Sequence, residues 1–133
     1  MTDEIKDETI CQEADRLVSG ERGSFYGHPL DDFSKTAVLW SVVLGVRVTA
    51  EQVTKCMAQV KVARELNRHK RDNLVDECGY VKCLDIVIAE RERRLSTGWT
   101  FDEMTGRWFA PPMAPQPVLF PVDLGISTLE NNK

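Results

Sequence analysis

The sequence predicts an all-α domain with a four-helix, bundle-like core, followed by an extended tail rich in proline and aromatic residues. Apolar residues recur at three- and four-residue steps through most of the first 97 residues, which is the pattern of amphipathic helices. After Gly98 the composition changes, and five of the six prolines lie between residues 111 and 121. We therefore divide the chain of 133 residues into a helical domain, residues 1–97, and a tail, residues 98–133, that packs on the bundle or on a neighbouring subunit.

The first two predicted helices flank a loop that contains glycine and proline. Thr2–Ser19 starts with a capping threonine and several acidic residues, as the positive end of a helix dipole prefers, and Gly20 can end it. Residues 21–29, ERGSFYGHP, form the loop, and the second helix is expected to begin just after Pro29. Its segment Ser34–Leu44 is apolar on nearly all sides, so we expect this helix to be buried.

The third and fourth predicted helices meet in a strongly charged segment. Thr49 can cap the third helix, and the basic residues Arg68 to Arg71 suit its C-terminal end. Asp72 can cap the fourth helix, which runs to about Leu95. Either one kinked helix or a tight hairpin would connect the two segments, and we favour the hairpin.

The first part of the tail predicts a short β-hairpin. Aromatic and polar residues alternate from Trp99 to Phe109, and Gly106 lies at the expected turn. The prolines that follow keep the rest of the tail extended and non-helical.

Composition excludes several classes of protein. The formal net charge of −4 argues against nonspecific DNA binding, which normally requires a basic surplus. No segment approaches the length of a membrane span, and the acidic N-terminus lacks the features of a signal peptide, so we expect a cytoplasmic protein without membrane partners. The cysteines have no zinc-binding spacing and are expected to be buried free thiols, as in a reducing cytoplasm. They are Cys11, Cys56, Cys78 and Cys83.

Two carboxylates are expected on one side of the fourth helix, where it turns toward the core. Asp72 and Asp76 are four residues apart and so face the same way. Two unpaired carboxylates at that position would be costly unless a cation neutralised them. Mg²⁺, held by carboxylates and by the phosphates of a substrate, would meet this need.

A basic surface is expected on the third helix. Lys61, Arg64, Glu65 and Arg68 are spaced i, i+3, i+4 and i+7, which places them on one face. In a hairpin this face would lie opposite the two aspartates, and its cations would bind phosphate. The alternative is an interhelical salt-bridge network whose basic residues only stabilise a helix end.

The loop before the second helix is a further candidate. Phe25 or Tyr26 could stack on a base, and His28 could contact phosphate or act as an acid; alternatively, the loop is a tight turn whose aromatic residues fill the edge of the core. The full set of candidate ligand-binding residues is Tyr26, His28, Lys61, Arg64, Arg68, His69, Lys70, Asn73 and Tyr80, and the candidate catalytic and metal-binding residues are Glu65, Asp72 and Asp76.

Two segments, ERGSFYGHPLDDFSKTAVLW and VKVARELNRHKRDNLVDECGYVKCLD, carry a resemblance to a known group. They resemble small actinobacterial-phage proteins with a domain of unknown function, described as similar to the MazG-like all-α nucleoside triphosphate pyrophosphohydrolases. The resemblance covers roughly Ala14 to Glu90. It implies a helical bundle, usually homo-oligomeric, with magnesium held by carboxylates from two helices, in the cytoplasm of an infected host cell.

The acidic motifs of the MazG group are only partly present. That group carries an ExxE pair on one helix and an ExxD pair on the next, whereas this chain has Asp72 and Asp76 in a DxxxD arrangement. Asp72 or Asp76 therefore corresponds to the second pair, and Glu65 alone to the first.

Three hypotheses for the function follow. The first is a Mg²⁺-dependent nucleoside triphosphate pyrophosphohydrolase that uses Glu65, Asp72 and Asp76. The second is a non-catalytic protein that binds and sequesters a nucleotide or another phosphorylated small molecule, for example a signal of the host's defence. The third is a small interaction module that acts through its aromatic tail.

Overall fold

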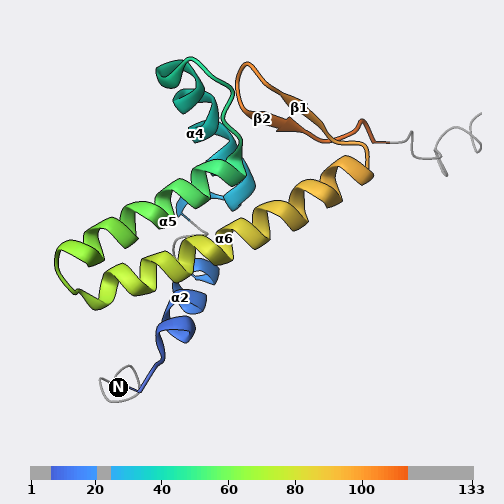
Figure 1. Cartoon of the computed structure of the whole chain (residues 1–133). Coiled ribbons are helices and arrows are strands. Elements are labelled where there is room, and N and C mark those ends of the chain that lie inside the picture. The colour runs from blue at the N-terminus through green and yellow to red at the C-terminus, as the bar shows by residue number, and fades with distance from the viewer. Residues whose placement is uncertain (1–6, 21–24, 114–133) are drawn as a thin grey trace, which may run out of the picture.

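The computed structural model describes residues 7–20 and 25–113, and this part of the chain is mostly α-helical, as predicted. Helices α5 and α6 form a long hairpin; α2 packs on α6, and α4 with a small β-hairpin lies toward the other end of the structure (Figure 1). The elements are α2, Ile10–Ser19; α4, Pro29–Leu44; α5, Ala50–Asn67; α6, Arg71–Ser96; β1, Thr100–Asp102; and β2, Arg107–Phe109.

Capping residues explain where two of the helices begin. At α5, the side chain of Thr49 accepts a hydrogen bond from the backbone of Gln52, and the Gln52 side chain accepts one in return, which confirms the predicted start. Thr9 and Gln12 form the same reciprocal pair at α2. The helix therefore begins at Ile10, later than predicted, and the proposed cap Thr2 lies outside the described residues.

The connection between α5 and α6 is the predicted hairpin. Arg68 and Lys70 both have extended backbone conformations, which end one helix and reverse the chain before the next. Asp72 was expected to cap α6, but Lys70 occupies the cap position and Asp72 lies in the first turn. An acidic residue is still favourable there because it faces the positive end of the helix dipole.

Helix α4 is less buried than its sequence suggested. It begins at Pro29, and Gly45 ends it in a left-handed conformation with φ of 69°. Leu30 and Ala37 are buried, but Leu39, Val42 and Val43 are 67, 78 and 83% exposed. The prediction of burial on all sides was wrong because the described neighbours, α5, α6 and β2, leave one side of the helix uncovered.

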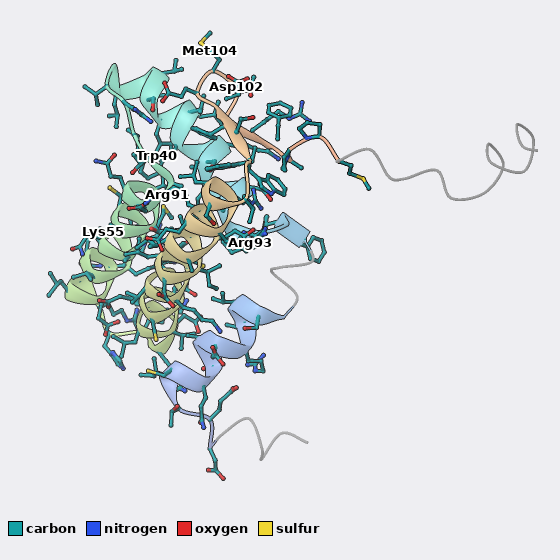
Figure 2. All side chains as sticks on the ribbon, turned by 90° about the vertical axis from the view of Figure 1, so that its right-hand side faces the viewer. Trp40, Lys55, Arg91, Arg93, Asp102 and Met104 are labelled. Atoms are coloured by element: carbon teal, nitrogen blue, oxygen red, sulfur yellow. The ribbon has the colours of Figure 1, made fainter. Side chains whose placement is uncertain are left out.

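The predicted β-hairpin is present and packs on α4. Phe101 on β1 pairs with Trp108 on β2, and the Trp108 indole donates a hydrogen bond of 3.1 Å to the Ser34 hydroxyl. Gly106 occupies the turn with φ of 71° and lies directly against the backbone of α4. Met104, at the tip, points away from the bundle (Figure 2). The tail from residue 114 onward lies outside the described residues.

A buried arginine near the end of α6 connects three parts of the fold. Arg94 is 5% exposed and makes two hydrogen bonds, of 2.5 and 3.0 Å, to the Asp31 carboxylate near the start of α4. A third bond, of 3.0 Å, reaches Glu90, and the guanidinium lies 4.6 Å from the ring centre of Trp99. Hydrogen bonds from Arg93 and Arg94 lower the pKa of Glu90 to about 2. No sequence pattern predicted this network.

The four cysteines are free thiols but are not buried as predicted. Cys11 and Cys56 are exposed, and Cys78 and Cys83 are half-buried. The described core consists of a few small and medium side chains, so cysteines on the helix surfaces remain in contact with solvent. Among the described residues, no helix combines the length and the apolar character that crossing a bilayer requires.

Candidate ligand-binding cleft

A cavity of about 380 Å³ is lined by the loop before α4 and by the four helices α2, α4, α5 and α6. Gly79 on α6 faces α2, and a Cβ at this position would be in ordinary contact with the Val18 side chain, 3.5 Å away. Gly27 adopts φ of 75°, which turns the chain at the rim of the cavity. The lining residues are Val18, Tyr26, Gly27, Pro29, Asp32, Phe33, Lys61, Asp76, Gly79, Tyr80 and Cys83.

Aromatic rings form much of the cavity wall. Phe33 and Tyr80 meet edge to face with their ring centres 6.3 Å apart. Tyr26 is exposed at the rim. Tyr26, a predicted stacking residue, and Tyr80, a predicted ligand-binding residue, thus line one cavity although they are more than fifty residues apart in sequence. Phe25, the alternative stacking residue, does not line it.

An ion pair between α5 and α6 lies at the polar end of the cavity. The ammonium of Lys61 is 2.9 Å from the Asp76 carboxylate, and the two side chains are 15 and 19% exposed. The predicted hairpin requires these two faces to oppose each other, and the ion pair shows that they do.

A second, open hollow of about 640 Å³ adjoins the cavity along this ion pair. We call it the cationic groove; it carries four lysine and arginine side chains against two carboxylates. In the described part of the chain, no carboxylate is within ion-pair distance of Arg64 or Arg68. The groove is lined by Lys61, Arg64, Arg68, His69, Lys70, Asp72, Asn73 and Asp76.

Glu65 closes the turn between α5 and α6 and does not line the groove. Its carboxylate is bonded to His69, to the backbone N–H of Lys70 at 3.1 Å and to the amide of Asn73 at 3.1 Å. These hydrogen bonds lower the pKa of the Glu65 carboxyl, and the bond from His69 has the largest effect. Glu65 therefore has a structural role that explains its position.

The three predicted metal-binding carboxylates do not come together. The described residues contain no group of three histidine, cysteine, aspartate or glutamate side chains placed to hold a metal ion. Glu65 is bound by donors of the turn, Asp76 is paired with Lys61, and Asp72 is 70% exposed with its carboxylate 4.0 Å from the Lys70 ammonium. The donor set therefore does not fit a magnesium site in this arrangement.

His28 has a different position from the one expected of a ligand-binding residue. Its Nδ1 accepts a hydrogen bond of 3.0 Å from the backbone N–H of Leu30, so the ring caps α4 and does not line the cavity. Burial lowers the pKa of His28, which keeps this nitrogen unprotonated and able to accept the bond.

Several cavity residues were not predicted, and Asp32 and Phe33 are the most prominent of them. Asp32 was not among the candidate site residues, but its side chain lines the cavity, and burial raises the pKa of its carboxyl. Phe33, the next residue, adds a third aromatic ring to the cavity, beside those of Tyr26 and Tyr80. Their position in the first turn of the helix after the YGHP segment was the available signal, because that segment was already a candidate for ligand contact.

Comparison with known proteins matches one region of the chain to a family model, and the whole site lies inside that region. The family described as "Domain of unknown function (DUF6378)" matches residues 9–88. The Gene 55 protein of Mycobacterium phage D29 is 36% identical over 84 residues, 62% of this chain and 56% of that protein. The Gene 55 protein of Mycobacterium phage L5 is 29% identical over 92 residues, 68% of this chain and 59% of that protein. No solved structure matches significantly.

These matches agree with part of the expected resemblance. The expected region, Ala14 to Glu90, nearly coincides with residues 9–88, and the similar proteins are phage proteins. The matched region includes every residue that lines the cavity and the groove. The chain spans somewhat more than half the length of these two relatives.

Proposed function

The chain belongs to the DUF6378 family, and we propose that it binds a nucleotide with the base in the aromatic cavity and the phosphates in the cationic groove. One observation carries the proposal: Lys61 and Asp76 line both hollows, so a single ligand can extend from one into the other. A nucleotide has this same division into a flat aromatic part and an anionic part.

The cavity suits a base. Its volume of about 380 Å³ falls within the range of small-molecule sites, about 300–1,000 Å³. Tyr26 and Tyr80 offer rings for stacking, which stabilises bound bases by about 1–3 kcal/mol each. The Asp32 carboxylate can accept hydrogen bonds from the N–H groups of a base or from a sugar hydroxyl.

The groove suits phosphates. Arg64 and Arg68 have no carboxylate partner among the described residues, and their planar guanidinium groups match phosphate oxygens in pairs. Lys70 is 73% exposed at its side chain and adds a further positive charge. The phosphates of a ligand would thus bind cationic side chains that contact water in the unbound protein.

Binding without hydrolysis is the form of the proposal that this arrangement favours. A MazG-like pyrophosphohydrolase would need Asp72, Asp76 and Glu65 as metal ligands, whereas Glu65 serves the turn and Asp76 pairs with Lys61. Sequestration of a phosphorylated molecule requires only the cavity and the groove. We therefore place sequestration before Mg²⁺-dependent hydrolysis, and both before an interaction module based on the tail.

Thermal-shift and calorimetric titrations of the purified protein test this proposal. We expect nucleoside triphosphates to raise the melting temperature with or without Mg²⁺. Arg64→Ala is expected to raise the Kd of the triphosphate about tenfold or more, because a hydrogen bond to a charged group is lost, while the weaker binding of the uncharged nucleoside stays unchanged. Tyr26→Ala should weaken both ligands.

Lys55→Ala is the matched control, since Lys55 is an exposed lysine of α5 outside the groove (Figure 2). If no nucleotide shifts the melting temperature, the proposal is wrong. Equal losses from Lys55→Ala and Arg64→Ala would also contradict it, since binding would then follow the total charge. Stabilisation that strictly requires Mg²⁺, together with pyrophosphate release, would favour the hydrolase.

We also propose that the protein is a homo-oligomer that associates through α4. Leu39, Val42 and Val43 are exposed on α4 at i, i+3 and i+4 spacing, which is the pattern of a helix that packs on another helix, and exposed Val46 follows just after the helix end at Gly45. The segment from Thr36 to Val46 carries no charged residue, so its best complement is an equally apolar stripe, such as the same stripe of a second copy. The rim carries both signs of charge, in the ion pair of Arg47 with Glu103.

Light scattering coupled to size-exclusion chromatography measures this association. We expect the wild type at a multiple of 15.1 kDa and Val43→Glu at 15.1 kDa with unchanged helical circular dichroism. Leu66→Glu is the control, because Leu66 is 84% exposed on α5, as exposed as Val43 but without an apolar stripe. A monomeric wild type, or an oligomer that tolerates Val43→Glu, would contradict the proposal.

A further inference from the structure

Two thiols from distant parts of the chain lie side by side at the surface. Cys11 on α2 and Cys78 on α6 are 67 residues apart in sequence, yet their Sγ atoms are separated by 3.6 Å. Cys11 is exposed and Cys78 is half-buried. Both line a shallow surface hollow of about 370 Å³, which admits a small reactant to the sulfur atoms.

Contacts on both sides of this cysteine pair hold α2 and α6 in register. One turn further along each helix, the Lys82 ammonium is paired with the Asp15 carboxylate and donates a hydrogen bond of 2.8 Å to the Ser19 hydroxyl. Toward the start of α6, Arg71 binds the Glu13 carboxylate at 3.1 Å. The proximity of the sulfur atoms is therefore fixed by the packing of two helices and does not depend on one flexible side chain.

We propose that Cys11 and Cys78 form a thiol–disulfide exchange site that reacts with small-molecule disulfides of the glutathione type and closes an internal disulfide between α2 and α6. The sulfur atoms need to approach from 3.6 Å to the bond length of about 2.0 Å, a change that side-chain rotation can supply. This inference does not depend on nucleotide binding, since neither cysteine lines the cavity or the groove.

The exposure of the two thiols sets the order of the steps. The Cys11 thiolate attacks one sulfur of the external disulfide, forms a mixed disulfide and releases one small thiolate. Cys78 loses its proton to water, attacks the Cys11 sulfur and releases the second small thiolate. In total two protein thiols are oxidised and one external disulfide is reduced to two thiols. Burial and the neighbouring Cys11 raise the pKa of Cys78, which suits Cys78 to the second step.

The disulfide would stabilise the fold by constraining the unfolded chain. It would close a loop of 67 residues, and loops of this size give large reductions in the entropy of the unfolded state. It would also fix α2 on α6, and α2 contributes Val18 to the wall of the cavity. We therefore expect the melting temperature of the oxidised protein to exceed that of the reduced protein by several degrees.

Oxidation of the full-length protein with oxidised glutathione, followed by intact-mass analysis and peptide mapping, tests the inference. We expect a species lighter by two hydrogen atoms, with the peptides of Cys11 and Cys78 joined. Cys78→Ser is expected to stop at a glutathione adduct on Cys11, and Cys11→Ser to form no internal disulfide. Cys56→Ser and Cys83→Ser serve as controls and should react like the wild type.

Two results would overturn the inference. One is a protein that keeps four free thiols, or carries only glutathione adducts, under conditions that oxidise a vicinal dithiol peptide. The other is an internal disulfide that survives in Cys11→Ser or Cys78→Ser. Circular dichroism before oxidation verifies that each serine variant is folded, which is expected because all four cysteines retain contact with solvent.

Discussion

Replacement of Arg94 by alanine is expected to lower the free energy of unfolding by about 3 kcal/mol. Arg94 is buried, makes two hydrogen bonds to Asp31 and a third to Glu90, and lies over the ring of Trp99. Alanine would leave both carboxylates without this partner and would remove the contact with the indole. We place the cost at the low end for a broken buried ion pair because the Asp31 side chain is 39% exposed.

Urea denaturation followed by circular dichroism measures the effect of Arg94→Ala, and Arg93→Ala is its control. Arg93 pairs with the same Glu90 carboxylate, at 2.6 Å, but its side chain is 55% exposed (Figure 2). We expect this exposed pair to contribute less than about 1 kcal/mol. Equal losses of stability in the two variants would mean that burial of Arg94 does not have the energetic role inferred from its contacts.

Gly106→Ala is expected to detach the β-hairpin from α4 and to lower the free energy of unfolding by about 3 kcal/mol. Gly106 has φ of 71°, and a Cβ at this position would lie 2.6 Å from the Ser34 carbonyl oxygen and 3.0 Å from the Lys35 Cα. Both atoms belong to the backbone of α4 and cannot move aside as a flexible side chain would. The left-handed conformation adds a further cost of about 1–2 kcal/mol for any residue with a Cβ.

Denaturation of Gly106→Ala, with the fluorescence of the tryptophans as a second probe, tests this expectation. Gly45→Ala is the matched control, because Gly45 has a similar φ of 69° but no atom within 4 Å of the added Cβ. The control should show only the conformational cost of about 1 kcal/mol. If Gly106→Ala matched Gly45→Ala and kept the Trp108 environment, the close approach of the hairpin to α4 would be contradicted.

Local structure in this protein follows from the amino-acid sequence alone. The boundaries of α5, the end of α4 at Gly45 and the turn at Gly106 follow from residues within four positions of each boundary. The hairpin of α5 and α6 was also favoured over one kinked helix from the charged segment between the two helices, and the structure confirms it. That hairpin in turn placed Lys61 opposite Asp76 and grouped the basic residues of the groove.

Only the tertiary structure decided which faces are covered and which partners meet. The sequence pattern included Glu65 beside Asp72 and Asp76 among the candidate metal ligands, but in the folded chain the Glu65 carboxylate binds the turn at Lys70 and Asn73. In the same way, the His28 side chain caps α4 and does not line the cavity, whereas the Asp32 side chain does line it. The apolar pattern of α4 could not show that one side lacks a described neighbour.

Contacts between residues far apart in sequence leave no periodic signal in either partner, and for this reason they escaped prediction. Arg94 looked like one of several solvated arginines at a helix end, yet its position against Asp31 buries it. Cys11 and Cys78 looked like two unrelated thiols, yet the packing of α2 on α6 brings them together. Hydrophobic periodicity predicts that helices pack, but the angle and register at which they pack depend on the shapes of all the side chains at the interface.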